Sequence, residues 1–251
     1  MGLDSKSLVG KWIAITRPAH QSRPIEKTLR QAGANVILFP LLEIVALENP
    51  GLQNIQSYGL LVFVSPNAVQ QALKWLSTAD VKNVKIAAVG KKTAGLLEKN
   101  GITPDIYPSH YFNSEALLAM PEMQAGVIKG QRIAIIRGEG GRNLLRDTLR
   151  VRGASVDNIN IYRRRCPQKN ANFLKQHWQR GELDIIMLTS ASSVANLFKL
   201  ADFAKDNWLN QLTLLLGSER MQQALPKNFK GRVLVADDPG DETLIKRLTH
   251  G

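Results

Sequence analysis

The residues most able to do chemistry in this chain follow apolar segments that end in small polar turns. Ser65 and Asn67 stand in one such turn, and Ser190 and Ser192 stand in another. Side chains of this kind cap the N-termini of helices, and the same helix ends bind carboxylates and phosphates through free N–H groups. The residue types therefore allow either plain helix capping or an anion-binding site, and the pattern leaves both open.

Glycine turns follow two further apolar segments. The first contains Gly90, Lys91 and Thr93, and the second contains Gly217. Glycine lets the backbone approach a ligand closely, and Lys91 would add a positive charge beside it. A tight connection between a strand and a helix, with lysines on the surface, explains the same pattern equally well.

Two arginines, Arg17 and Arg137, each end an apolar segment, and Gly138 with further glycines follows the second. The spacing of these glycines does not match a dinucleotide-binding fingerprint, and the lysine of a phosphate-binding loop is missing. We therefore expect no nucleotide site, whereas a carboxylate could be held at this turn.

Tyr162 lies near the end of another apolar segment, directly before three arginines. Most tyrosines in such a place are half-buried packing residues. In a cleft beside cationic groups, however, the phenol could donate a proton to a leaving hydroxyl group. The four histidines are isolated and Cys166 is the only cysteine, so we expect no metal site and no disulfide.

The composition is that of a globular protein with excess positive charge. The 251 residues are 44% hydrophobic and carry a formal net charge of +12. The apolar stretches are too short to cross a bilayer, and the N-terminus lacks the apolar core of a signal peptide, so we expect a cytoplasmic protein. Its MGLDSK start fits an N-myristoylation pattern only loosely. The charge suits nucleic acid, an anionic membrane or a polyanionic small molecule. Because the basic residues are spread along the chain, nucleic acid is not favoured.

Three pairs of segments recur in the same order, which indicates an internal duplication. The pairs are residues 12–36 with 132–156, 58–73 with 183–198, and 84–101 with 212–225. Arg17 aligns with Arg137, and Ser65 aligns with Ser190. Apolar strands that alternate with helices predict parallel sheets covered on both faces, as in a flavodoxin-like doubly wound unit. Ligands bind outside the carboxyl ends of such strands, where all these candidate residues would lie.

The ordered set of motifs resembles the uroporphyrinogen-III synthase family along essentially the whole chain. The motifs include Thr16-Arg17-Pro18, Phe39-Pro40-Leu41, Ser65-Pro66-Asn67-Ala68-Val69, Gly90-Lys91-Lys92-Thr93, Ile136-Arg137-Gly138, Ile161-Tyr162-Arg163-Arg164 and Leu188-Thr189-Ser190. Each motif alone is weak, and it is their order that is specific. The chain departs from the family at Val64, where the family often has Thr, and after Gly217, where the Thr that corresponds to Thr93 is missing.

The resemblance implies an α/β fold with two flavodoxin-like doubly wound parallel-sheet domains, joined by a two-strand β-ladder linker. Domain 1 would comprise residues 1–38 and 168–251, domain 2 would comprise residues 49–159, and residues 39–48 and 160–167 would form the linker. The substrate cleft would lie between the domains, and hinge motion would close it.

The activity that the resemblance implies is cyclisation of hydroxymethylbilane to uroporphyrinogen III, with inversion of ring D and loss of water. The enzyme would be a monomeric lyase of haem biosynthesis that uses no cofactor or metal. Tyr162 is then the candidate general acid. The expected substrate-binding residues are Arg17, Ser65, Asn67, Gly90, Lys91, Thr93, Arg137, Gly138, Ser190, Ser192 and Gly217. Nucleic acid and membrane are not expected partners, and contact with the preceding deaminase of the pathway is left open. The alternative is a non-catalytic, basic, two-lobed module that binds anions or nucleic acid.

Overall fold

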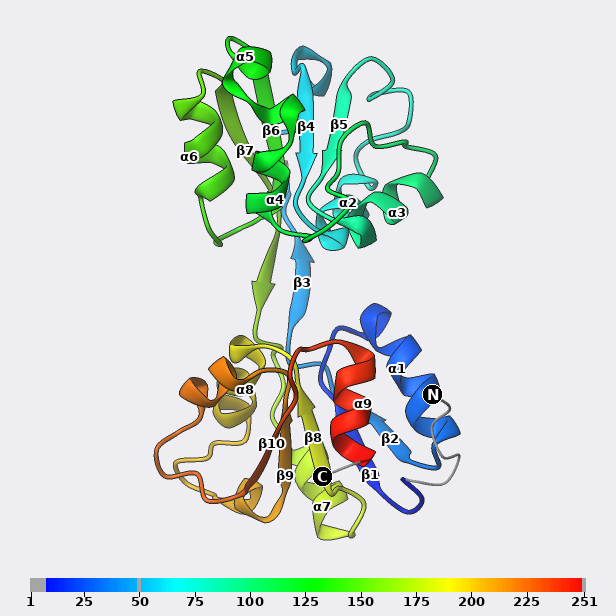
Figure 1. Cartoon of the computed structure of the whole chain (residues 1–251). Helices are drawn as coiled ribbons and strands as arrows, with labels where there is room; N and C mark the ends of the chain where they lie inside the picture. Colours follow the sequence, from blue (N-terminus) through cyan, green and yellow to red (C-terminus); the bar gives the residue numbers. More distant parts are fainter. Residues whose placement is uncertain (1–7, 49–50, 250–251) are drawn as a thin grey trace. The chain divides into compact units, whose positions relative to one another are not determined.

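The computed structural model describes residues 8–48 and 51–249 of the chain. The loose myristoylation pattern and His250 lie outside the described residues. The chain divides into two compact units, which we call unit 1 (Met1–Glu43 with Arg165–Gly251) and unit 2 (Ile44–Arg164) (Figure 1). In the part of the chain that the structure describes, every helix is too short or too polar to cross a membrane.

Unit 1 is built on a five-stranded sheet in the order β10-β9-β8-β1-β2, and its neighbouring strands run parallel. The strands are β1 (Trp12–Ile15), β2 (Asn35–Leu38), β8 (Ile185–Leu188), β9 (Thr213–Leu216) and β10 (Arg232–Val235). The order reverses between β1 and β8, as in doubly wound sheets of the flavodoxin type.

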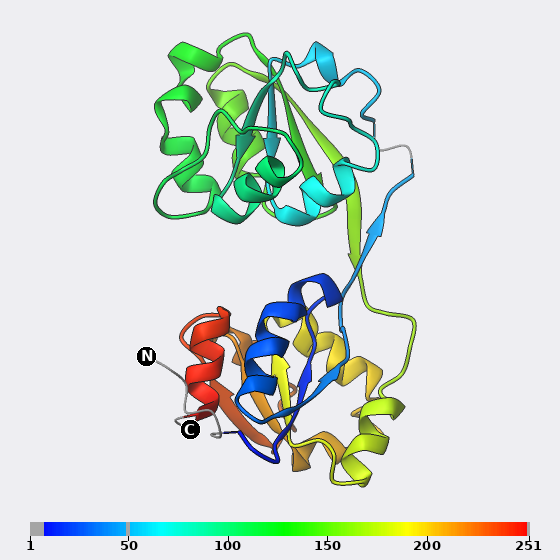
Figure 2. The same cartoon turned by 90° about the vertical axis from the view of Figure 1, so that its right-hand side faces the viewer.

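Helices cover both faces of this sheet because successive residues of each strand point to opposite sides. Ile13 and Ile15 pack with α1 (Ala19–Gln31) and α9 (Asp241–Thr249) on one face, whereas Ala14 packs with α7 (Asn172–Gln179) and α8 (Ala191–Leu200) on the other (Figure 2). Short 3₁₀ helices, η3 (Trp208–Gln211) and η4 (Glu219–Ala224), complete the unit.

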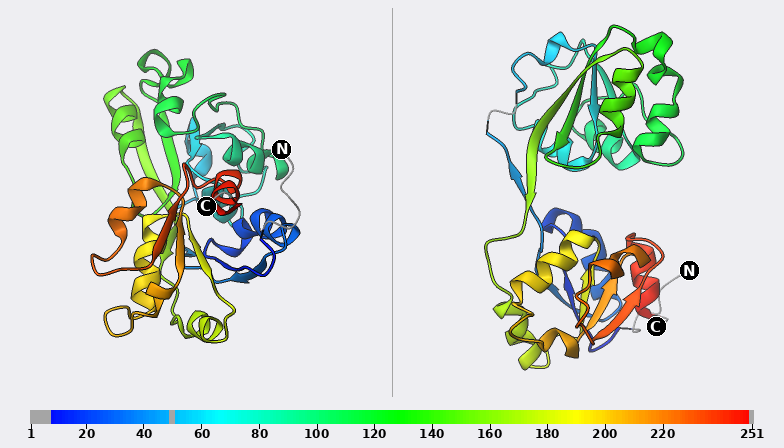
Figure 3. Two further views of the ribbon diagram at one scale, coloured as in Figure 1. Left: turned by 60° about the horizontal axis from the view of Figure 1, so that its bottom comes forward. Right: turned by 90° about the vertical axis from the view of Figure 1, so that its left-hand side faces the viewer.

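Unit 2 contains a sheet in the order β3-β7-β6-β4-β5. Its strands are β3 (Glu43–Ala46), β4 (Leu60–Phe63), β5 (Lys85–Ala88), β6 (Arg132–Gly138) and β7 (Ser155–Arg165). The pairs β5–β4, β4–β6 and β6–β7 are parallel. Helices α2 (Pro66–Ala72) and α3 (Lys91–Lys99) cover one face, and α4 (Ser114–Ala119), α5 (Ala125–Ile128) and α6 (Leu144–Val151) cover the other (Figure 3). The 3₁₀ helices η1 (Ile55–Ser57) and η2 (Pro121–Met123) lie in the connections.

Residues 160–165 of the connection expected at residues 160–167 form the end of β7, an 11-residue strand whose body pairs with β6. The Leu47 N–H group donates to the Ile161 carbonyl oxygen at 3.0 Å, and Arg165 pairs with Glu43 at 2.9 Å, so β3 runs antiparallel to the end of β7. β7 continues beyond the apolar core of unit 2, although its last side chains are polar, because β3 provides hydrogen-bond partners for its backbone.

The duplicated segments occupy equivalent places in the two sheets. The order β9-β8-β1-β2 in unit 1 corresponds to β5-β4-β6-β7 in unit 2, which pairs each strand with its repeat in the sequence. An isolated parallel bridge between Ala87 and Ile106 lies beside β5, where β10 lies beside β9. The predicted α/β class with parallel sheets is confirmed, and the residues that follow these strands lie at the carboxyl end of each sheet.

Candidate functional site

The structure separates the predicted site residues into two groups, one at the carboxyl end of each sheet. Unit 2 holds Ser65, Asn67, Gly90, Lys91, Thr93, Arg137, Gly138 and Tyr162. Unit 1 holds Arg17, Ser190, Ser192 and Gly217.

Tyr162 owes its position to an irregularity in the pairing of β6 with β7. The register shifts between Arg137 and Gly138, so that Gly138 lies opposite Tyr162. Irregularities of this kind redirect side chains. Ile161 and Tyr162, although neighbours in the sequence, both pack into the apolar cluster beneath α2 and α3. The tyrosine side chain is as a result only 1% exposed.

The phenol oxygen of Tyr162 lies between two polar side chains. It is 3.2 Å from Ser65 Oγ, and an Arg164 Nη2 group donates to it at 3.0 Å. The Arg164 guanidinium also lies 5.3 Å from the centroid of the tyrosine ring. Ser65 in turn caps α2, because its Oγ accepts the Ala68 N–H group at 3.1 Å. These contacts join the ends of β4 and β7 into one hydrogen-bonded group.

Gly138 makes room for the tyrosine ring. A Cβ atom at this position would lie 2.5 Å from both Cε2 and Cζ of Tyr162, which is far closer than carbon atoms pack. The backbone on either side holds the same arrangement, because the Glu139 N–H group donates to the Tyr162 carbonyl oxygen at 2.8 Å. The glycine therefore has a steric reason in the fold, and its contact with substrate stays a prediction.

Arg137 is buried and directs its guanidinium into its own turn. It donates to the carbonyl oxygens of Gly138 at 3.3 Å and Arg142 at 3.2 Å, and also to that of Gly140. Burial lowers the pKa of this guanidinium, and the nearby charge of Arg146 lowers it further. The side chain thus organises the glycine-rich turn, and its role in substrate binding stays a prediction.

The N-terminus of α3 is arranged differently from that of α2. Gly90 stands at its N-cap and offers no side-chain hydrogen bond, so the first turn keeps N–H groups that have no partner within the helix. Lys91 is exposed there, whereas Thr93 is buried. A Cβ atom on Gly90 would lie 2.7 Å from Phe112 Cβ, so this glycine also lets an aromatic loop pack closely.

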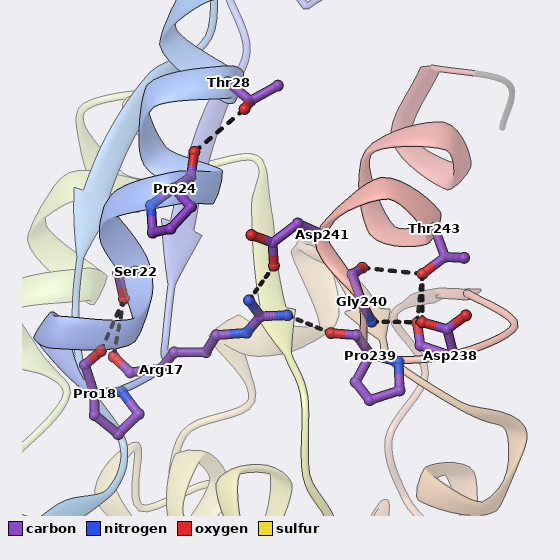
Figure 4. Close-up of polar contacts among 10 residues, drawn as sticks. All are labelled: Arg17, Pro18, Ser22, Pro24, Thr28, Asp238, Pro239, Gly240, Asp241 and Thr243. Carbon is purple, nitrogen blue, oxygen red and sulfur yellow. Dashed lines mark hydrogen bonds and ion pairs between the residues drawn. The ribbon is translucent and has the colours of Figure 1, made fainter. Parts of the chain in front are cut away.

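In unit 1 the charge of Arg17 is already neutralised. Its guanidinium forms an ion pair with Asp241 and donates to the Pro239 carbonyl oxygen (Figure 4). These contacts tie the end of β1 to the start of α9. Arg17 thus holds the fold of its own unit, and its role in substrate binding stays a prediction.

Two of the three remaining candidates of unit 1, Ser190 and Gly217, also have structural contacts. Ser190 and Ser193 form a reciprocal capping box, with each Oγ accepting the other's N–H group, at 3.1 and 3.2 Å. A Cβ atom on Gly217 would lie 2.8 Å from Pro239 Cβ, so this glycine accommodates the loop that holds Arg17. Ser192 is exposed in the first turn of α8.

Arg164 contacts the phenol but is not among the residues predicted from the sequence, where it stands only in a run of arginines. Its position two residues after Tyr162 places both side chains on one face of the strand. Cavities in unit 2 open around Lys85 and around Tyr58, at the amino end of the sheet, and so away from this group. Among the described residues, no set of three or more His, Cys, Asp or Glu side chains is grouped to hold a metal ion.

Comparison with known proteins gives one consistent result. The family model described as "Uroporphyrinogen-III synthase HemD" matches residues 23–246. The uroporphyrinogen-III synthase of Escherichia coli (strain K12) is 30% identical over 249 residues, covering 94% of this chain and 99% of that protein. That of Salmonella typhimurium (strain LT2) is 31% identical over 246 residues, with the same two coverages of 94% and 99%.

Solved structures show the same fold at lower sequence identity. Uroporphyrinogen-III synthetase from Helicobacter pylori 26695 aligns with a TM-score of 0.60 at 15% identity, covering 94% of this chain and 97% of that one. A mutant uroporphyrinogen III synthase from the extreme thermophile Thermus thermophilus aligns with a TM-score of 0.53 at 18% identity, covering 94% and 98%.

Proposed function

The chain belongs to the uroporphyrinogen-III synthase family, and we propose that it is a lyase that cyclises hydroxymethylbilane to uroporphyrinogen III, with inversion of ring D and loss of water. The observation that carries this proposal is the family match across residues 23–246. The likeness to the solved structures adds the fold alone. Neither the comparisons nor the site favours the alternative of a nucleic-acid-binding module.

The carboxyl end of the unit 2 sheet suits a polycarboxylate. The substrate carries about eight carboxylates, which are ionised at neutral pH. The N-terminus of α3 offers N–H groups and the positive end of the helix dipole, and Lys91 and Lys92 follow Gly90 in its first turn. A net charge of +12 would also speed the capture of such an anion.

The first chemical step needs an acid. Loss of the hydroxyl group from the hydroxymethyl carbon requires a proton on the leaving oxygen and produces an electrophilic azafulvene. Tyr162 is the proposed source of the proton, supported by its contacts with Ser65 and Arg164. A spiro intermediate then fragments and closes again with ring D inverted. Since the open chain also closes unaided without inversion, the enzyme's main task is to hold the substrate in the right conformation.

The finer architecture is part of this proposal. We propose two flavodoxin-like domains, with residues 39–48 and 160–167 as the connecting β-ladder, in a cytoplasmic monomer that uses no cofactor. The strand order of unit 1 and the antiparallel pairing of β3 with β7 support this arrangement. Transient contact with the deaminase that supplies the substrate would shorten the lifetime of free hydroxymethylbilane.

The test is an isomer assay. Purified protein is supplied with freshly prepared hydroxymethylbilane, and the uroporphyrinogen isomers are separated after oxidation. We expect the type III isomer to dominate with the active protein and the type I isomer to dominate with heat-denatured protein. Folded protein that leaves the isomer ratio unchanged would overturn the proposed function.

A further inference from the structure

The phenol that the proposed reaction requires is enclosed by its own unit. Tyr162 is 1% exposed, with its ring against Gly138 and the cluster beneath α2 and α3. Ser65 is only half-buried, at the N-terminus of α2, with its Oγ 3.2 Å from the phenol oxygen. A proton that leaves Tyr162 for a ligand at the carboxyl end of this sheet therefore meets the Ser65 hydroxyl first.

The hydrogen-bonding capacities of the three groups set a direction for the proton. A guanidinium can only donate, so the phenol oxygen is the acceptor in its contact with Arg164. The phenol keeps one proton of its own to donate, and Ser65 Oγ is within reach of it. A serine oxygen accepts two hydrogen bonds, and the Ala68 N–H group supplies only one. If the Tyr162 phenol donates the second hydrogen bond to Ser65 Oγ, the serine's own proton points away from both Ala68 and Tyr162.

We propose that Ser65 is the catalytic residue that delivers the proton to the leaving hydroxyl group, and that Tyr162 lies behind it as the proton donor. Arg164 is the positioning residue that stabilises the phenolate left on Tyr162. This inference rests on the proposed function and names the group that touches the substrate in its first step.

The relay balances without any further reactant. The C–O bond of the hydroxymethyl group breaks as the pyrrole nitrogen lone pair forms the azafulvenium cation, and the Ser65 proton joins the leaving oxygen to give water. The Tyr162 proton moves to Ser65 Oγ at the same time, and the phenolate remains beside Arg164. After the spiro intermediate fragments, the second ring closure takes place at a ring D carbon that carries hydrogen, and that carbon loses its proton to the relay in reverse. The phenol is thereby restored, and no electrons are gained or lost.

The Arg164 contact suits a phenolate in particular. Its N–H group points at the atom where negative charge develops, at 3.0 Å, and hydrogen bonds between charged partners are stronger than those between neutral ones. The guanidinium also lies 5.3 Å from the centroid of the same ring, which fixes the ring and the donor together. Arg164 is itself exposed, and its hydrogen bond already points at the phenol oxygen before the proton leaves.

A double-mutant cycle tests the relay. Tyr162→Phe and Ser65→Ala should each lower kcat by about 10²-fold, with KM changed little, because both remove the same proton transfer. The double variant should then be no slower than the slower single variant. Two effects that multiply would overturn the relay, since they would show that the two hydroxyl groups act independently.

A second pair of variants separates proton transfer from helix capping. Ser65→Asn keeps an N-cap oxygen but has no transferable hydroxyl proton, and Ser65→Thr keeps both. We expect Ser65→Asn to lose as much kcat as Ser65→Ala, and Ser65→Thr to retain most of it. This pair decides the matter even if Ser65→Ala does not fold, and full turnover by Ser65→Asn would overturn the proposal.

The chain provides a matched control at the amino end of the same sheet. The Arg132 guanidinium lies 4.6 Å from the centroid of the Tyr58 ring, so the two residues repeat the Arg164–Tyr162 pairing away from the site. We expect Arg164→Met to lower kcat by about tenfold and Arg164→Lys to restore part of it. Tyr58→Phe and Arg132→Met should leave kcat unchanged. Equal losses in both pairs would show that the Arg164 effect is structural.

These outcomes are distinguishable from failure of the proposed function. Wild-type protein that forms no type III isomer would remove the proposed function itself. Wild-type protein that forms the type III isomer, combined with full kcat in Ser65→Asn, would remove only the relay.

Discussion

The carboxyl ends of the two sheets are built from equivalent strands but use their polar groups differently. In unit 1, Arg17 is paired with Asp241, and Ser190 is closed into a capping box with Ser193. In unit 2, the serine equivalent to Ser190 is Ser65, which contacts Tyr162 as well as capping its helix. The arginines of both copies are satisfied within their own units, and the difference lies in the serines, because only Ser65 also contacts a buried phenol.

The turns that begin at Gly90 in unit 2 and at Gly217 in unit 1 also differ between the two copies. Lys91 follows Gly90 in unit 2, but Glu219 lies in the first turn after Gly217 in unit 1. A carboxylate is favoured near the first of these helix ends and repelled near the second. The two copies thus share their strand order, while the charges at these turns differ.

The largest expected effect comes from adding a methyl group to a tightly packed glycine at the carboxyl end of each sheet. Gly138→Ala places a methyl group against the Tyr162 ring, and Gly217→Ala places one against Pro239. Each should lower the free energy of unfolding by about 1–3 kcal/mol, measured by urea denaturation. Only Gly138→Ala should also lower kcat, by about tenfold or more, because it displaces the phenol. An equal loss of kcat in Gly217→Ala would break the comparison.

Removing the partner of Arg17 should affect the stability of the fold more than turnover. Asp241→Asn leaves the largely buried Arg17 guanidinium without its counter-charge, so we expect a loss of about 1–2 kcal/mol in the free energy of unfolding. Turnover at saturating substrate should change less than twofold. A clear fall in KM would instead show that the released Arg17 reaches the substrate and would support its predicted binding role.

Reversing the charges of Lys91 and Glu219, in the turns after Gly90 and Gly217, tests where the substrate carboxylates bind. Lys91→Glu should raise KM by roughly three- to tenfold without changing kcat, because it places negative charge at the N-terminus of α3. The increase should shrink as salt is added, since exposed charges are screened. The matched change in unit 1, Glu219→Lys, should alter KM less than twofold. A larger effect in unit 1 than in unit 2 would reverse the comparison.

The smallest effect concerns an exposed ion pair of unit 2. Arg142 donates to Glu115 at 2.5 Å, and this hydrogen bond holds the pKa of the Glu115 carboxyl group below its usual value. A carboxyl group whose pKa is lower in the folded state stabilises the fold above its unfolded pKa and loses that contribution as the pH falls. The difference in Tm between wild type and Glu115→Gln should therefore be largest at neutral pH and shrink as the carboxyl group is protonated in acid. A difference that stays the same in acid would assign the effect to packing.

Much of the architecture follows from local patterns in the sequence. Apolar strands that alternate with helices predicted the parallel sheets, and the repeats around Arg17 and Arg137 predicted the equivalent strands. The position of the candidate residues followed from chain direction alone, since each stands directly after a strand. The length of β7 could not be predicted in this way, because its polar end is held by β3 rather than by the core.

The sequence by itself therefore determined the α/β class, the duplication, the family resemblance and the edge of each sheet at which polar residues gather, because all of these depend on patterns within short segments. Only the tertiary structure decided which polar groups are already engaged. Arg17 meets Asp241 across 224 residues, and Ser65 meets Tyr162 across 97. Contacts between residues so distant in the chain depend on strand order, register and packing. They pair Arg17 with Asp241 and place Ser65 beside the phenol.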